Sequence, residues 1–191
     1  MSAIPVAEEG RALFQTTFNP EQFFAGDIAK DSDDQLIMTV ATSKRDDYLP
    51  DYSLAIAYRC DPIGDNKCQP NYIARMLRVR PSEGLSNISY DPEHLEWLEA
   101  SLWDCEGGIS AMESVRKSDW HPDIHYMLLG REDRDLIFHP AMIRIKMVGT
   151  YTTTSYEGWV LAQGAPAAVH EMVSILDRCW RPSESLPPWR H

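Results

Sequence analysis

The distribution of hydrophobic and polar positions predicts three β-strands in the first half of the chain. Large side chains recur at every second position over residues 52–58, and a similar alternation runs through residues 71–80. Residues 36–42 form a continuous apolar and β-branched run. A period of two places every second side chain on the same face of a sheet. We therefore expect three strands, with residues 52–58 and 71–80 joined as a hairpin.

The second half of the chain combines strand and helix patterns. Within residues 136–164, Ile143, Ile145 and Met147 alternate with basic residues, which predicts a strand with one apolar face. Residues 166–180 instead repeat their hydrophobic positions at helical spacing, and the predicted helix has one apolar stripe. This stripe consists of Val169, Met172, Val173, Leu176, Cys179 and Trp180.

Two further helices are expected between the strand regions. Asp91 and Pro92 are favourable residues for a helix N-terminus, and Gly107-Gly108 is a favourable end. Between them, four hydrophobic residues fall on one helical face: Leu95, Leu98, Leu102 and Cys105. A shorter helix is expected to follow through Ile109, Met112 and Val115.

These elements together indicate one α+β domain over residues 1–191. Helices that lie between and after meandering strands are typical of an antiparallel sheet with helices packed on one face, here including a C-terminal helix. We expect residues 1–34 to form a helical or irregular N-terminal segment and residues 182–191 to form an irregular tail. A chain of 191 residues is long enough to bury one good hydrophobic core. It has no apolar run long enough to span a membrane.

The chain has four cysteines, which allow three disulfide pairings. Cys60 and Cys68 bracket a turn-rich segment, so a Cys60–Cys68 bond would close the predicted hairpin. Cys105 and Cys179 each lie near the end of an apolar stripe, which predicts a Cys105–Cys179 bond. Two disulfides indicate a periplasmic or secreted protein whose leader has been removed. The alternative is a cytoplasmic protein with four reduced thiols.

The charge is strongly negative and unevenly distributed. The formal net charge is −11, and residues 81–115 contain eight acidic residues but no Lys or Arg. Such a surface disfavours nucleic acid and attracts a basic protein partner, although charge runs are also ordinary solvated faces. We expect Trp103 to pack beneath the following helix. The predicted partner-binding surface on the helix of residues 91–105 consists of Glu93, Glu96, Trp97, Glu99 and Asp104.

The candidate chemistry is limited to one metal-ligating pattern. His121, Asp123 and His125 occupy alternate positions, so an extended backbone would place their side chains on one face and allow them to bind Zn²⁺. No phosphate-binding glycine motif occurs, and we expect no cofactor. The interpretation that we favour is a non-enzymatic binding protein, for example an inhibitor or immunity protein. The alternatives are a metal-dependent hydrolase and an accessory subunit of a larger assembly.

Overall fold

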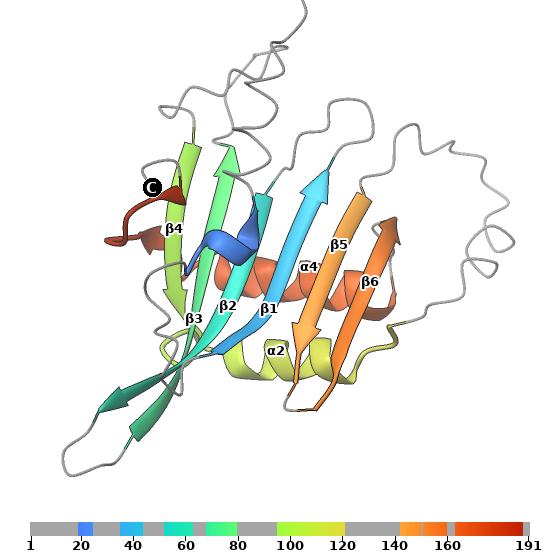
Figure 1. Cartoon of the computed structure of the whole chain (residues 1–191), viewed down its shortest axis with the longest axis horizontal. Coiled ribbons are helices and arrows are strands. Elements are labelled where there is room, and N and C mark those ends of the chain that lie inside the picture. The colour runs from blue at the N-terminus through green and yellow to red at the C-terminus, as the bar shows by residue number, and fades with distance from the viewer. Residues whose placement is uncertain are drawn as a thin grey trace, which may run out of the picture.

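In a computed structural model, the described part of the chain forms one antiparallel sheet and two α-helices, which confirms the predicted α+β class (Figure 1). The structure describes residues 19–24, 35–43, 52–62, 68–79, 95–120, 142–149, 151–159 and 163–188. The seven strands are hydrogen-bonded in the order β6-β5-β1-β2-β3-β4-β7. The elements are η1 (Pro20–Gln22), β1 (Gln35–Ser43), β2 (Tyr52–Pro62), β3 (Cys68–Val79), β4 (Leu95–Ser101), α2 (Gly108–Lys117), β5 (Met142–Val148), β6 (Thr153–Trp159), α4 (Gly164–Leu176) and β7 (Arg181–Pro182).

The first four strands form a meander, and the second half of the chain extends it in both directions. β5 returns to pair with the free side of β1, and β6 continues outward from β5. At the opposite edge, the short strand β7 pairs with β4 after α4 has ended. The strands predicted from residues 36–42, 52–58, 71–80 and 143–147 therefore all exist.

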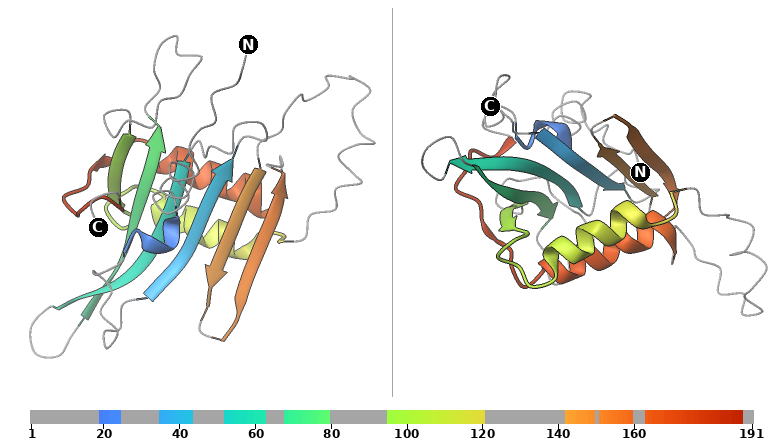
Figure 2. Two further views of the ribbon diagram at one scale, coloured as in Figure 1. Left: turned by 45° about the horizontal axis from the view of Figure 1, so that its top comes forward. Right: turned by 90° about the horizontal axis from the view of Figure 1, so that it is seen from below.

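The larger hydrophobic core lies between the sheet and the two helices. Figure 2 shows α2 and α4 side by side on the same side of the sheet. Their apolar stripes pack against alternate side chains of the five inner strands, as the strand patterns predict. Fully buried members of this core include Leu54, Met76, Ile145, Val115 and Met172.

A second, smaller core lies on the opposite face of the sheet. The 3-10 helix η1 is capped by Asn19, whose side chain accepts a hydrogen bond from the Glu21 amide at 3.1 Å. The chain after η1 then places Phe23 and Phe24 against the sheet, where they pack with Trp97 of β4. This part of the N-terminal segment therefore holds the sheet from the face away from the helices (Figure 1).

The helix predicted over residues 91–105 is wrong, because residues 95–101 form strand β4. Leu and Glu favour a helix in isolation, but cross-strand pairing outweighs this preference. Arg75 of β3 lies opposite Glu99, and Arg78 lies opposite Glu96. Two arginines on one strand and two glutamates on the next thus fix an antiparallel register that a helix could not provide.

The other two predicted helices are present in the structure, but their lengths differ from the prediction. The short helix predicted through Ile109, Met112 and Val115 is α2. The C-terminal helix α4 ends at Leu176, before the predicted limit at residue 180, because the chain turns there and brings Cys179 toward Cys105. Neither helix has the length and hydropathy of a membrane span within the described residues.

Candidate functional site

In the structure, two glutamates of the predicted acidic surface are paired with arginines. Glu96 accepts a hydrogen bond from Arg78 at 2.7 Å, and Glu99 accepts one from Arg75 at 2.9 Å. Both carboxylates are thus neutralised by neighbouring arginines of β3. Glu93 lies outside the described residues. Of the predicted acids, only Asp104 is placed as an exposed carboxylate.

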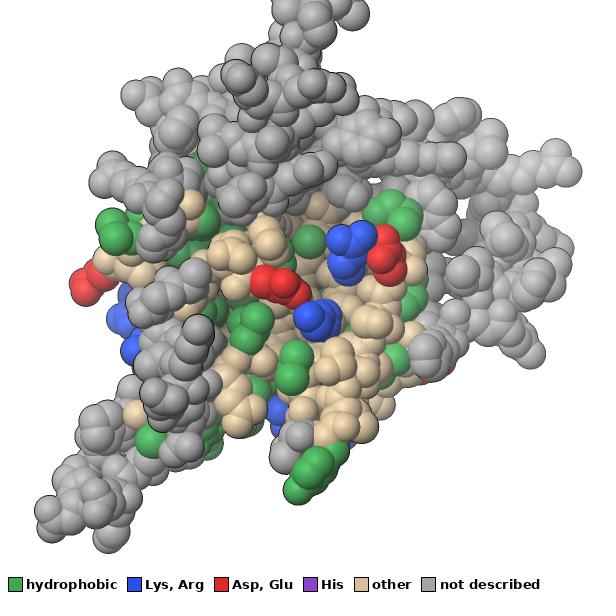
Figure 3. Space-filling model, viewed as in Figure 1, with side chains coloured by type: hydrophobic (Ala, Val, Ile, Leu, Met, Phe, Trp, Pro, Cys, Tyr) green, Lys and Arg blue, Asp and Glu red, His purple; other side chains and the backbone are tan. Residues whose placement is uncertain are grey.

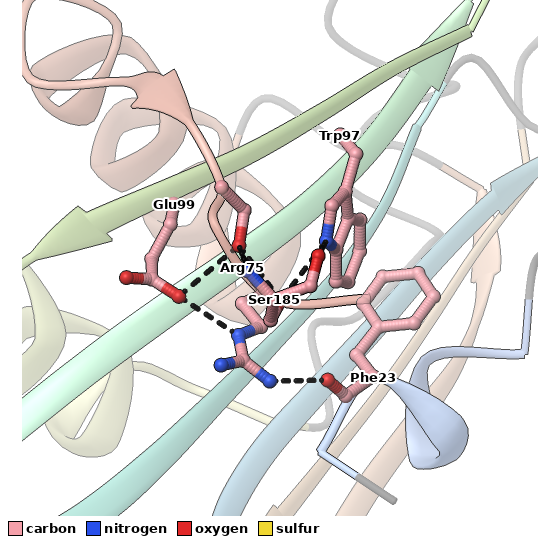
Figure 4. A network of polar contacts seen from close by, with 6 residues as sticks. Phe23, Arg75, Trp97, Glu99 and Ser185 are labelled. Carbon is pink, nitrogen blue, oxygen red and sulfur yellow. Dashed lines mark hydrogen bonds and ion pairs between the residues drawn. The ribbon is translucent and has the colours of Figure 1, made fainter. Parts of the chain in front are cut away.

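Trp97 is an internal contact of the protein. It is only 8% exposed, and its ring meets that of Phe23 edge to face, with 4.9 Å between the centroids. Its indole N–H donates to the Ser185 hydroxyl at 3.0 Å (Figure 4). Trp97 therefore joins η1, the sheet and the C-terminal segment, which leaves little of its surface for a partner.

Arg75 organises the polar part of the same face. Its guanidinium donates to the Glu99 carboxylate at 2.9 Å and to the Phe23 carbonyl at 2.8 Å (Figure 4). Its Cζ atom lies 4.4 Å from the centre of the Phe24 ring. Ser183 donates to the same carboxylate oxygen of Glu99 at 3.2 Å. Arg75 therefore fastens the segment after η1 to the sheet, and we assign it a structural role.

Trp103, which we expected to be buried, is 54% exposed and lies in the turn between β4 and α2. The exposed residues Asp104 and Glu106 are close to it in this turn, and neither carboxylate makes an ion pair with a described residue. Sequence reasoning missed this site because it extended a helix through residue 105. The signal that could have revealed it is Gly107-Gly108, which follows within four residues and favours a turn.

The turn of residues 102–107, which we call the Trp103 turn, is held at several points. The predicted bond between Cys105 and Cys179 is present and attaches the turn to the segment after α4. Arg178 donates a hydrogen bond to the Glu106 carbonyl. Gly107 has a φ of 83°, and a Cβ atom on Gly108 would lie only 2.6 Å from the Leu102 carbonyl oxygen. The backbone can follow this path because both residues are glycine.

A projecting part of the β2–β3 hairpin lies beside the Trp103 turn. β1 pairs with β2 only as far as Tyr58, and β4 pairs with β3 only as far as Ile73. Residues 59–62 and 68–71 therefore pair only with each other among the described strands, and they extend beyond the sheet (Figure 1). The Leu102 amide donates to the Tyr72 carbonyl at 2.9 Å, so the Trp103 turn contacts the base of this ribbon.

The ribbon also contains a disulfide-bonded cysteine. Cys60 is disulfide-bonded, and no described cysteine is free. The side chain of Cys68, its predicted partner, lies outside the described residues. At the base of the ribbon, the rings of Tyr58 and Tyr72 meet at 68° with 5.6 Å between their centroids. An isolated two-stranded ribbon is only marginally stable in water, and these contacts favour an ordered ribbon.

The described residues contain no set of three potential metal ligands. The predicted ligands His121, Asp123 and His125 lie outside the described residues, so their arrangement stays a prediction. A pocket of about 320 Å³ lies between the end of α2 and the β5–β6 turn. Among the described residues that line it, Arg116 is the only charged one, so they bring together neither an acid–base pair nor a ligand set.

On the sheet face away from the helices, described basic and acidic side chains lie beside each other (Figure 3). Arg144 of β5 donates to Glu157 of β6 at 2.8 Å and 3.1 Å, and Lys146 donates to Glu21 at 2.8 Å. The hydrogen bond from Arg144, together with its charge, lowers the pKa of the Glu157 carboxyl. The pair therefore stabilises the fold above the ordinary carboxyl pKa, and this contribution is lost as pH falls through the lowered value.

Arg144→Gln is expected to move the pKa of Glu157 upward toward its ordinary value, because the hydrogen bond and the charge are both removed. An NMR titration of the side-chain carboxyl carbon measures this shift. Lys146→Gln is the matched control, since Lys146 contacts Glu21 and leaves Glu157 with its partner. An unchanged Glu157 pKa in Arg144→Gln would contradict the assignment.

Comparison with protein-family models, with curated proteins and with solved structures gave no match to this chain. The geometry of the site alone therefore supports the functional proposal.

Proposed function

We propose that the protein is a non-enzymatic binding protein that docks on a basic protein partner through the Trp103 turn. The observation that carries this proposal is the exposure of Trp103 on a turn that a disulfide holds in place. Tryptophan is enriched among the residues that dominate binding energy at interfaces. The surface differs from the predicted helix, although Asp104 belongs to both.

The rigidity of the turn supports a role in binding. Exposing a large aromatic side chain to water is unfavourable, and a flexible turn would let Trp103 fold back onto the apolar surface nearby. The Cys105–Cys179 bond and the hydrogen bond from Arg178 to the Glu106 carbonyl restrict this freedom. Because the turn is ordered before a partner arrives, association loses less conformational entropy.

The electrostatics support a cationic partner. The chain has a net charge of −11, which steers positively charged proteins toward it and repels acidic ones. Asp104 and Glu106 add local negative charge beside Trp103, whereas Glu96 and Glu99 are already paired with arginines. Tyr58 and Tyr72 lie partly buried at the base of the adjacent ribbon, and tyrosine gives large contact area with few rotatable bonds.

An inhibitor or immunity protein of an extracytoplasmic compartment fits these features best. The disulfide is typical of proteins that fold in an oxidising environment. Neutralising a cationic toxin or hydrolase requires only a complementary rigid surface. We therefore place the proposed activity at the end of the sheet where the Trp103 turn and the ribbon meet.

Photo-crosslinking in the native source tests the proposal. A photoreactive phenylalanine derivative replaces Trp103, and the same residue replaces Ser114, which is exposed on α2, as the control. We expect position 103 to crosslink one basic protein, identified by mass spectrometry, and position 114 to crosslink none. Equal labelling at both positions, or an acidic partner at position 103, would contradict the proposal.

Trp103→Ala is expected to weaken binding to the crosslinked partner by about 30-fold, because truncation of a central interface tryptophan costs about 2 kcal/mol. Titration calorimetry of the purified pair measures the change. Ser114→Ala should bind as the unmodified chain does. An affinity of Trp103→Ala within twofold of that value would exclude the Trp103 turn as the main contact.

A further inference from the structure

The two ends of the sheet differ in how their outermost strands are covered. At one edge, β4 is covered by β7, where Pro182 lies opposite Leu98, and the Ser183 amide then donates to the Trp97 carbonyl at 3.0 Å. At the other edge, β6 pairs with β5 on its inner side. Among the described strands, none pairs with its outer side (Figure 1).

β6 lacks the features by which edge strands usually avoid pairing. Proteins protect such edges with lysine, proline, bulges or very short strands. β6 has seven residues, contains no Lys or Pro, and pairs with β5 without a register shift from Met142↔Trp159 to Val148↔Thr153. Its Thr and Tyr residues favour the extended conformation. The strand is thus suited to accept a further strand.

The segment around β6 is also poor in charge. Glu157 is the only Asp, Glu, Lys or Arg in the 23 residues 147–169, which include β6 and the first half of α4. At the average charged fraction of this chain, 25%, such a segment would contain about six. Depletion of charged residues is a property of the buried centres of protein interfaces.

The single charge at this edge is balanced. Glu157 is bound to Arg144, whose Nη2 atom lies 2.8 Å from Oε1 of the carboxylate. β5 and β6 together contain Arg144, Lys146 and Glu157, a net charge of +1. Two copies of an acidic protein can therefore approach each other at this edge with less repulsion than their net charge of −11 would suggest.

We propose that β6 pairs antiparallel with β6 of a second copy of this chain and joins the two sheets into one. The strand runs from residue 153 to residue 159, so full overlap places the two-fold axis at Tyr156. In this register Tyr156 faces the partner's Tyr156, and Ser155 faces the partner's Glu157. Like charges do not face each other, which makes the strand complementary to itself.

The side chains fit this arrangement on both faces of the sheet. Tyr156 is half-buried and packs against the core beneath the helices, so pairing would extend that core across the axis. Glycine at position 158 leaves room for the Tyr156 ring, since a Cβ atom there would lie 2.8 Å from the tyrosine hydroxyl. On the other face, the Ser155 hydroxyl can donate to the carboxylate of the partner's Glu157.

Sedimentation velocity of the purified full chain tests the proposal directly. We expect a reversible monomer–dimer equilibrium within the range of about 1 µM to 1 mM that is typical of modest interfaces. Amide hydrogen exchange in β6 should slow as the protein concentration rises. A chain that sediments as a monomer throughout this range overturns the proposal and leaves the edge to a strand of another protein.

A charge substitution then tests the register. Ser155→Glu places two carboxylates opposite each other on each side of the axis, and we expect dimer dissociation to become about tenfold easier. Ser114→Glu on α2 carries the same change away from β6 and should leave the equilibrium unchanged. A melting temperature close to that of the unmodified chain shows that both variants fold. Equal effects of the two substitutions, or no effect of Ser155→Glu, overturn the proposed interface.

Discussion

Replacing Cys105 and Cys179 together by Ala is expected to lower the free energy of unfolding by about 4 kcal/mol. The bond joins residues 74 positions apart, and a cross-link of this span removes much conformational freedom from the unfolded chain. It also connects the Trp103 turn to the segment after α4, so its loss weakens the attachment of the turn to that segment. For a chain of this size, the melting temperature should fall by about 10 °C.

Urea denaturation of the oxidised chain and of the double variant measures the difference. Cys105→Ala alone would leave an unpaired thiol at position 179, so the double variant gives the cleaner comparison. Any remaining response of the double variant to a reductant belongs to the disulfide of Cys60. A loss below about 1 kcal/mol would show that the packing of α4 holds this end of the fold without the bond.

Arg75→Met is expected to cost about 3 kcal/mol of stability. The Arg75 side chain is only 5% exposed, and it neutralises Glu99, whose side chain is 21% exposed. Methionine retains an apolar stem of similar length but leaves both the Glu99 carboxylate and the Phe23 carbonyl without their main donor. Removing one partner of a buried ion pair is far more costly than replacing both.

A second substitution, in the partner residue Glu99, tests this explanation of the loss in stability. Adding Glu99→Gln to Arg75→Met should recover at least about 1 kcal/mol, because the uncompensated charge is removed. Arg144→Gln is the matched control on the same face, since its ion pair with Glu157 is exposed and exposed pairs contribute little. A double variant less stable than Arg75→Met would refute this account of the network.

The strands of the sheet could be predicted from sequence because their side-chain environments alternate. β2 and β5 each place large apolar residues on the helix face and smaller or polar ones on the other, so a period of two is visible. Helix α2 could also be predicted from its hydrophobic pattern, because Met112 and Val115 share one helical face. The prediction of the Cys105–Cys179 bond is confirmed, although the helical stripe that placed Cys105 is in fact strand β4 and the turn after it.

β4 could not be predicted in this way because both of its faces are covered. Leu98 packs beneath the helices, while Trp97 packs under the segment after η1. Without a solvent-exposed face, the hydrophobic pattern loses its period of two and imitates a helix. The sequence did contain one signal for this strand. Two arginines and two glutamates have the same spacing, but their match can be recognised only when the two strands are aligned: Arg75 and Arg78 with Glu99 and Glu96.

The candidate site shifted for the same reason. A helix over residues 91–105 exposes Trp97 and buries Trp103, whereas a strand followed by a turn does the reverse. Asp104 stayed in the site because it lies in the turn itself. The overall acidity of the chain was visible from composition, but Glu96 and Glu99 pair with arginines that lie 18 and 24 residues away in the sequence.

The strand order has a consequence for the order in which the protein folds. β1 is the first strand in the chain, yet it lies inside the sheet, and its neighbour β5 is made about 100 residues later. During synthesis, the meander of β1 to β4 can assemble while the outer side of β1 still lacks its partner. Contacts so distant in sequence slow folding, and an incomplete sheet exposes an apolar strand edge to other chains. When β5 arrives, it covers this edge of β1 and removes one site at which the incomplete sheet could pair with another chain.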